Sequence, residues 1–313
     1  MQLDNTRIAI RERDLLETLD LALHVTRQFA GPWLICSLLG IVPLALVNYA
    51  LVGWMIPWGW DEEGLPWRYL WSMSILVYLE APLASAFVVA YLGPAVFLET
   101  KTIRQVVSDV FHYALQISLC QFLLRGVLAA WLLYFLVERY QFSGPVEGFL
   151  LPCLALYATG MRAFRPYINE IILLERNPLR SNNPNVITVN KRSSHIHGPY
   201  SGDLFIRWLG LALIALLLIF MVLATAIVVQ GVLIGRWPFV FDTTRGPAPW
   251  DWIVWQLNWF EAQVAFPLCI WLIVAFMSVV RFLSYLDLRI RHEGWEVELL
   301  MRAEAMRLAA RME

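Results

Sequence analysis

Long apolar stretches, separated by short polar ones, dominate the chain. One uncharged stretch of 28 residues runs from Trp208 to Gly235, between Arg207 and Arg236, and it contains no proline. A helix of about 20 apolar residues crosses the hydrocarbon core of a bilayer, which is about 30 Å thick. A surface helix of a water-soluble protein keeps one polar face, and this stretch has none. The pattern therefore predicts a membrane-spanning helix.

Five further apolar stretches bring the number of predicted transmembrane helices to six. The fourth is the weakest, because only Gly148 to Met161 lack charge before Arg162 and Arg165. Arginines at the end of a span can extend toward the headgroups, which permits a short crossing. The predicted membrane domain covers residues 29–284, with spans at 29–56, 69–98, 110–137, 148–172, 208–235 and 262–280.

Amphipathic segments flank this membrane domain on both sides. Asp14 and Glu17 stand at the spacing of a capping box, and leucines follow at helical spacing. Residues 1–28 are therefore predicted to include a helix that lies in the membrane interface. Residues 285–313 contain a charged pair at i, i+4, Glu298 and Arg302, which favours a C-terminal helix.

The distribution of cations predicts the topology. Cytoplasmic loops of membrane proteins are enriched in Lys and Arg. With six crossings, one side of the membrane holds 19 of the 24 Lys and Arg residues, and the loops of the other side hold four. Each span that runs from the outer to the inner side ends in a short similar sequence with an acidic residue, at Glu99, Glu175 and Asp287. We expect an all-α protein with six spans in three hairpins and both termini in the cytoplasm.

Composition narrows the classes of function. A net charge of −1 excludes a broadly basic nucleic-acid-binding protein. The four cysteines lie in apolar stretches without C-x-x-C spacing, which favours packing over disulfides or zinc. His195 and His197 would share one face of an extended segment, but no third ligand stands nearby. No catalytic motif is present, so no catalytic residue, metal or cofactor is predicted.

Two charges interrupt the predicted spans, Glu80 in the second and Arg125 in the third. A charge near the bilayer centre costs about 2.5–3.5 kcal/mol on insertion scales, so it faces protein or water. Both residues lie at a similar depth, and we expect them to form an ion pair that holds two helices together. The alternative is a polar pathway or ligand site at the same position.

Two groups of surface residues are candidates for contacts outside the chain. Tryptophans at i, i+3 and i+7 form an outer aromatic face, which suits a membrane-interface belt or a docking surface; they are Trp252, Trp255 and Trp259. Cations at the inner interface are expected to meet lipid phosphates; they are Lys191, Arg192, Arg281, Arg289 and Arg291.

Three passages together resemble a known family. They are DLLETLDLALHVTRQFAGPWL at 14–34, PYINEIILLER at 166–176 and YLDLRIRHEGWEVELL at 285–300. They are similar to the multi-helix membrane domain associated with bacterial glycerophosphodiester phosphodiesterases and to its stand-alone relatives of unassigned function. Residues 285–313 are too few for a phosphodiesterase catalytic domain, so we expect none in this sequence. The resemblance implies a multi-helix architecture and a bacterial inner-membrane location, and it carries no enzymatic activity over to this chain.

These observations favour a non-catalytic membrane protein, a scaffold or accessory subunit. Its expected partners are membrane lipids and a protein bound at the outer tryptophans or at the cytoplasmic C-terminal helix. The alternative is a transporter, channel or lipid-handling protein that uses the polar site around Glu80 and Arg125.

Overall fold

The computed structural model describes residues 13–55, 67–97, 101–140, 143–181, 186–234 and 260–293. This part of the chain is helical and contains no strand. The long or buried helices are α1 (Leu15–Gln28), α2 (Ala30–Val52), α3 (Trp67–Ala84), α4 (Ala86–Val96), α7 (Val127–Tyr140), α9 (Leu151–Phe164), α12 (Ser201–Ile234) and α14 (Phe260–Glu293). The shorter ones are η1 (Gly53–Met55), α5 (Ile103–His112), α6 (Ala114–Ile117), η2 (Ser118–Leu123), α8 (Ser143–Pro145), η3 (Val146–Leu150), α10 (Ile168–Leu173) and α11 (Val189–His197).

Four described helical stretches are long and apolar enough to cross a membrane. They are Ala30–Met55, Arg68–Val96, Ser201–Ala226 and Ala265–Arg291. A fifth is counted if Ile103–His112 and Ala114–Leu123, which meet at 59°, form one bent span. The predicted all-α, multi-span class is confirmed, whereas the number six is not.

The predicted third span, 110–137, is not one continuous helix. Its first residues belong to α5, which begins with a capping box formed by Thr102 and Gln105. The chain then bends at Tyr113 and passes through the π-helix η2. It breaks again at Gly126, whose φ of 80° is one that side-chain-bearing residues rarely adopt.

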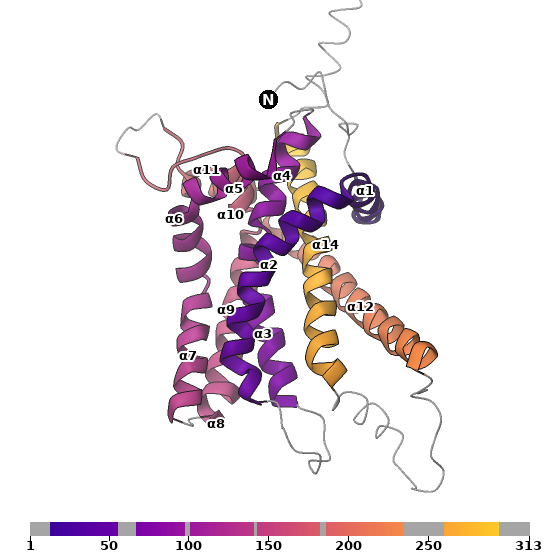
Figure 1. The fold of residues 1–313 in the computed structure, drawn as a ribbon. Helices are drawn as coiled ribbons and strands as arrows, with labels where there is room; N and C mark the ends of the chain where they lie inside the picture. The colour runs from indigo at the N-terminus through magenta and orange to yellow at the C-terminus, as the bar shows by residue number, and fades with distance from the viewer. Residues whose placement is uncertain are drawn as a thin grey trace, which may run out of the picture.

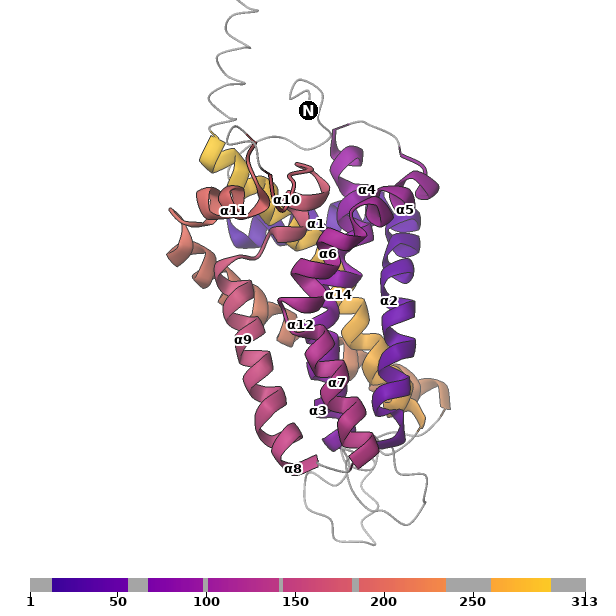
Figure 2. The same ribbon diagram turned by 90° about the vertical axis from the view of Figure 1, so that its left-hand side faces the viewer.

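The predicted fourth span, 148–172, is also divided. It begins in the π-helix η3, continues as α9 and stops at Phe164, after which Arg165 leaves the helical conformation. The short helix α10 completes the segment and is buried along its whole length. In Figures 1 and 2, α7 and α9 run lengthwise through the bundle beside α3.

Some of the short helices lie together at one end of the bundle. Figures 1 and 2 show α5, α10 and α11 there, together with α1. Figure 1 views α1 almost end-on, so this helix runs across the bundle. It starts at the predicted place, but the side chain of Asp14 makes no capping hydrogen bond. We call this end the α1 end.

Close helix contacts hold α2 against α3. A side chain at Gly40 would collide with the backbone of Ala84, so only glycine permits this approach. In contrast, α12 diverges from the bundle (Figure 1). Its most apolar 18-residue window has no buried residue, and Leu216, Leu217 and Phe220 are exposed. This face suits a lipid environment, where apolar exposure carries no penalty.

Two predicted boundaries shift. Helix α12 begins at Ser201, seven residues before the predicted span, and α14 continues to Glu293 without a break at 284–285. The last span and the start of the predicted C-terminal segment are therefore one helix. Residues 294–313 lie outside the described part of the chain.

Candidate functional site

Glu80 is completely buried between three helices. The side-chain amide of Asn48, on α2, donates to its Oε2 at 2.7 Å. The indole N–H of Trp131, on α7, donates to its Oε1 at 2.6 Å. These neutral donors satisfy both carboxylate oxygens and join α2, α3 and α7.

Arg125 is held elsewhere, at the break between η2 and α7. Its side chain is 1% exposed, and its Nη2 donates to the carbonyl oxygen of Arg165 at 2.9 Å. The expected ion pair with Glu80 is therefore not formed among the described residues. The breaks explain this outcome: an unwound turn between α9 and α10 offers Arg125 a carbonyl, while Glu80 is satisfied by Asn48 and Trp131.

Charged groups from three further positions surround Arg125. The charges of Arg162, Arg281 and Glu170 all act on its guanidinium. Glu170, on α10, is fully buried and pairs with Arg281, on α14, at 2.9 Å. Arg162 donates to the carbonyl oxygen of Leu79 at 3.0 Å. This group, the arginine cluster, is defined as Arg125, Arg162, Arg281 and Glu170.

Further hydrogen bonds complete this interior. Asn169, next to Glu170, accepts from Gln121 of η2 and donates to the carbonyl oxygen of Pro82 in α3. Arg281 also donates to the hydroxyl of Ser85 at 3.0 Å, at the break between α3 and α4. Each interrupted helix therefore turns polar atoms toward the same region, which is how membrane proteins accommodate irregular backbone.

A second carboxylate, Glu175, lies just beyond α10. Arg192 of α11 donates to both of its oxygens, at 2.6 and 2.9 Å, and the hydroxyl of Tyr285 donates at 2.7 Å. Arg289 lies 3.6 Å away. Burial alone would raise the pKa of Glu175, but these hydrogen bonds and charges outweigh it and hold the pKa below its usual value.

A third carboxylate, Asp287, joins the two ends of the described chain. It pairs with Arg207 at 2.6 Å and Arg291 at 3.2 Å, and it accepts from the backbone N–H of Arg13 at 2.8 Å. The same two arginines donate to the carbonyl oxygen of Arg13, at 3.0 and 2.7 Å. We call Arg13, Arg207, Asp287 and Arg291 the terminal latch.

Four of the five cations expected to face lipid are turned toward these carboxylates. Arg192 and Arg289 surround Glu175, Arg281 pairs with Glu170, and Arg291 pairs with Asp287. Lys191 is exposed. Periodicity along one segment could not show this, because each carboxylate is brought from another helix. Trp252, Trp255 and Trp259 lie outside the described residues.

The two loop histidines occupy a helix and point to different environments. His195 is exposed on α11, whereas His197 is buried and its Nδ1 lies 3.0 Å from the hydroxyl of Ser193. The shared face of an extended segment is therefore not formed. Burial and the nearby charge of Arg165 lower the pKa of His197 to about 4. Within the described residues, no group of three metal-ligating side chains could hold an ion.

The three passages that carry the family resemblance meet at the α1 end. Tyr285 and Arg289 contact Glu175, and Asp287 contacts the backbone of Arg13, which directly precedes the first passage. Helix α1 also packs against α14. The sequence pattern identified Glu175 and Asp287 as members of a short repeated sequence, but it did not indicate which residues pair with them. It had no signal for Asn48 or Trp131. Comparison with protein-family models, curated proteins and solved structures finds no match to this chain.

The separate partners of Glu80 and Arg125 predict the outcome of two double-mutant cycles. Glu80→Leu combined with Trp131→Phe should show a coupling of about 0.5–3 kcal/mol in the free energy of unfolding in detergent, because the two groups are in contact. Glu80→Leu combined with Arg125→Leu should be additive within about 0.5 kcal/mol. Strong coupling in the second cycle would instead indicate a direct ion pair between Glu80 and Arg125.

Protonation of His197 should destabilise the fold as the pH falls. Its folded-state pKa, about 4, lies below the usual histidine value of 6.5. Between these values the unfolded chain binds a proton that the folded chain does not, so stability falls by about 1.4 kcal/mol per pH unit. His197→Gln should flatten the melting temperature between pH 6.5 and 4.5, whereas His195→Gln on the exposed face should leave its slope unchanged. Equal slopes in all three proteins would contradict this assignment.

Proposed function

We propose that this protein is a non-catalytic membrane scaffold or accessory subunit. The observation that carries the proposal is the pairing of carboxylates with arginines at the α1 end. Glu170, Glu175 and Asp287 each pair with arginines from other helices. Buried pairs of this kind favour a unique arrangement when both partners are present, and each of these three carboxylates is engaged with a cation. Such an end suits a rigid platform.

The terminal latch supports the choice of docking region. It holds the start of α1 and the last turns of α14 side by side, through Asp287 and the carbonyl oxygen of Arg13. A partner bound at residues 294–313 would therefore meet a chain that leaves the bundle beside α1. The resemblance to phosphodiesterase-associated membrane domains agrees with a role beside another protein and stays a prediction.

The finer topology belongs to the same proposal: six crossings, both termini in the cytoplasm and a bacterial inner-membrane location. It is supported by the concentration of cations in the segments of the α1 end and by the lengthwise course of α7 and α9 (Figure 2).

Cysteine labelling tests the fourth crossing. Gly144→Cys at α8 and Ser194→Cys at α11 occupy exposed positions, separated along the chain by α9. In a background without the four native cysteines, an impermeant maleimide should label these two sites from opposite sides of the membrane. Labelling of both sites from the same side would show that the fourth span does not cross, and it would contradict the six-span topology.

A second candidate, a transporter or lipid-handling protein, is favoured by one observation. The Nε and Nη1 groups of the buried Arg125 have no hydrogen-bond partner within the described residues. Unsatisfied donors beside broken helices are typical of transport sites at mid-membrane.

In-cell cross-linking and reconstitution separate the two candidates. A scaffold should form a defined cross-linked complex that is lost on removal of residues 294–313 and weakened by Asp287→Asn, which disturbs the latch. Purified protein in liposomes should then leave lipid flip-flop and ion leak at the level of empty vesicles. Lipid or ion flux that is abolished by Arg125→Leu, in a variant that still folds, would contradict the scaffold role and favour the transporter or lipid-handling role.

A further inference from the structure

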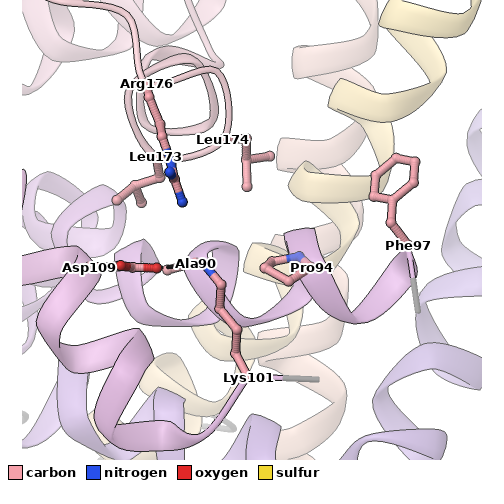
Figure 3. Close-up of a pocket in the computed structure, with 8 residues that line it drawn as sticks. All are labelled: Ala90, Pro94, Phe97, Lys101, Asp109, Leu173, Leu174 and Arg176. Atoms are coloured by element: carbon pink, nitrogen blue, oxygen red, sulfur yellow. Dashed lines mark hydrogen bonds and ion pairs between the residues drawn. The ribbon is translucent and has the colours of Figure 1, made fainter. Parts of the chain in front are cut away.

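A separate cavity of about 330 Å³ opens at the α1 end, away from the arginine cluster. Figure 3 shows the eight side chains that line it, contributed by α4 and its C-cap, by α5 and the residues just before it, and by the end of α10 and the residues just after it. Its size falls at the lower end of the range for small-molecule sites. The lining residues are Ala90, Pro94, Phe97, Lys101, Asp109, Leu173, Leu174 and Arg176.

The cavity has two chemically distinct parts. Its apolar wall comes from the last turns of α4, in the span Arg68–Val96, and from the leucines of α10. Its polar part contains Lys101, Asp109 and Arg176, which approach one another from two sides of the space in Figure 3. Because the wall belongs to the end of a span, the cavity lies where a bilayer meets water. This is the division that a lipid presents, with a charged headgroup next to an acyl chain.

The charged residues of the cavity favour an anionic ligand. Lys101 and Asp109 pair at 2.6 Å, so Asp109 fixes the ammonium in place and neutralises part of its charge. Arg176 is exposed and forms no ion pair with any described residue. The cavity therefore holds two cations against one carboxylate. Guanidinium and ammonium groups together suit a phosphate, which accepts several charge-assisted hydrogen bonds.

Backbone strain marks Arg176 independently of its charge. Its φ of 55° is the only positive value at a non-glycine residue in the described chain. The left-handed conformation is unfavourable for a residue with a side chain, and such residues cluster at ligand sites. Glycine would relieve the strain, yet an arginine occupies the position beside the cavity. Its guanidinium reaches down toward Asp109 and Ala90 in Figure 3.

We propose that this cavity binds the phosphate group of an anionic membrane phospholipid, with Arg176 and Lys101 on the phosphate and the α4–α10 wall against the upper acyl chain. The binding site goes beyond the scaffold role and does not depend on it. A resident lipid here would join α4, α5 and α10 at the membrane boundary.

Ligand-dependent thermal shifts of the purified full chain in detergent test the proposal. Dioctanoyl phosphatidylglycerol should raise the melting temperature in a saturable manner. Dioctanoyl phosphatidylcholine, which carries the same phosphate beneath a cation, should give a smaller shift at equal concentration. Inorganic phosphate has no acyl chain and should give little shift. An equal shift with inorganic phosphate would assign the site to a soluble anion and overturn the lipid assignment.

Variants at position 176 separate binding from folding. Arg176→Gly removes the guanidinium and also relieves the backbone, so the melting temperature without lipid should stay level or rise. Affinity for phosphatidylglycerol should fall at least about tenfold, the loss expected for one strong charge-assisted contact. Arg176→Gln should weaken binding similarly without the gain in stability. Arg180→Gln is the matched control, an exposed cation of the same segment outside the cavity, and should bind normally. Equal affinity in all four proteins would overturn the proposal.

Discussion

Three carboxylates, each paired with arginines from distant parts of the chain, determine how the helices meet at the α1 end. Removing one partner from such a buried pair leaves a charge without compensation and costs about 3–5 kcal/mol. Glu170 and Glu175 tie α10 to α14 and α11, and Asp287 ties α14 to α12 and to the start of α1. At this end the charge pairs add to an apolar core that contains Val25, Val89 and Phe282.

The opposite half of the bundle follows a different rule. Its core contains Leu76, Val127 and Trp271, and the buried carboxylate of Glu80 is satisfied by neutral donors instead of a cation. A buried carboxyl group needs either a counter-charge or hydrogen-bond donors in place of water. The fold uses the first solution at the α1 end and the second in the interior, so the two halves have separate polar networks.

Breaks in the helices supply backbone groups to these networks. The breaks near Ser85, Gly126 and Arg165 interrupt three different helical segments. Each break frees backbone groups that side chains then engage: Arg125 donates to the carbonyl oxygen of Arg165, and Asn169 donates to that of Pro82. A continuous six-helix bundle would leave Arg125 without this acceptor. The same irregularity at the end of α10 places Arg176 at the proposed lipid site.

The sequence by itself determined the class of protein. Uncharged stretches such as Trp208–Gly235 have one stable environment, and the helix follows because a bilayer offers no partner for backbone groups. The amphipathic helix at Leu15–Gln28 was equally predictable from local periodicity.

Only the tertiary structure decided which charges meet. Glu80 and Arg125 lie at similar predicted depth, yet depth does not specify the direction in which a helix turns its side chains. That direction depends on where the helices break, at Gly126 before α7 and at Arg165 after α9. The partners of Asp287 stand as far away as Arg13. A pairing over such a separation leaves no periodic trace in the sequence, because it is the packed helices that bring the two groups together.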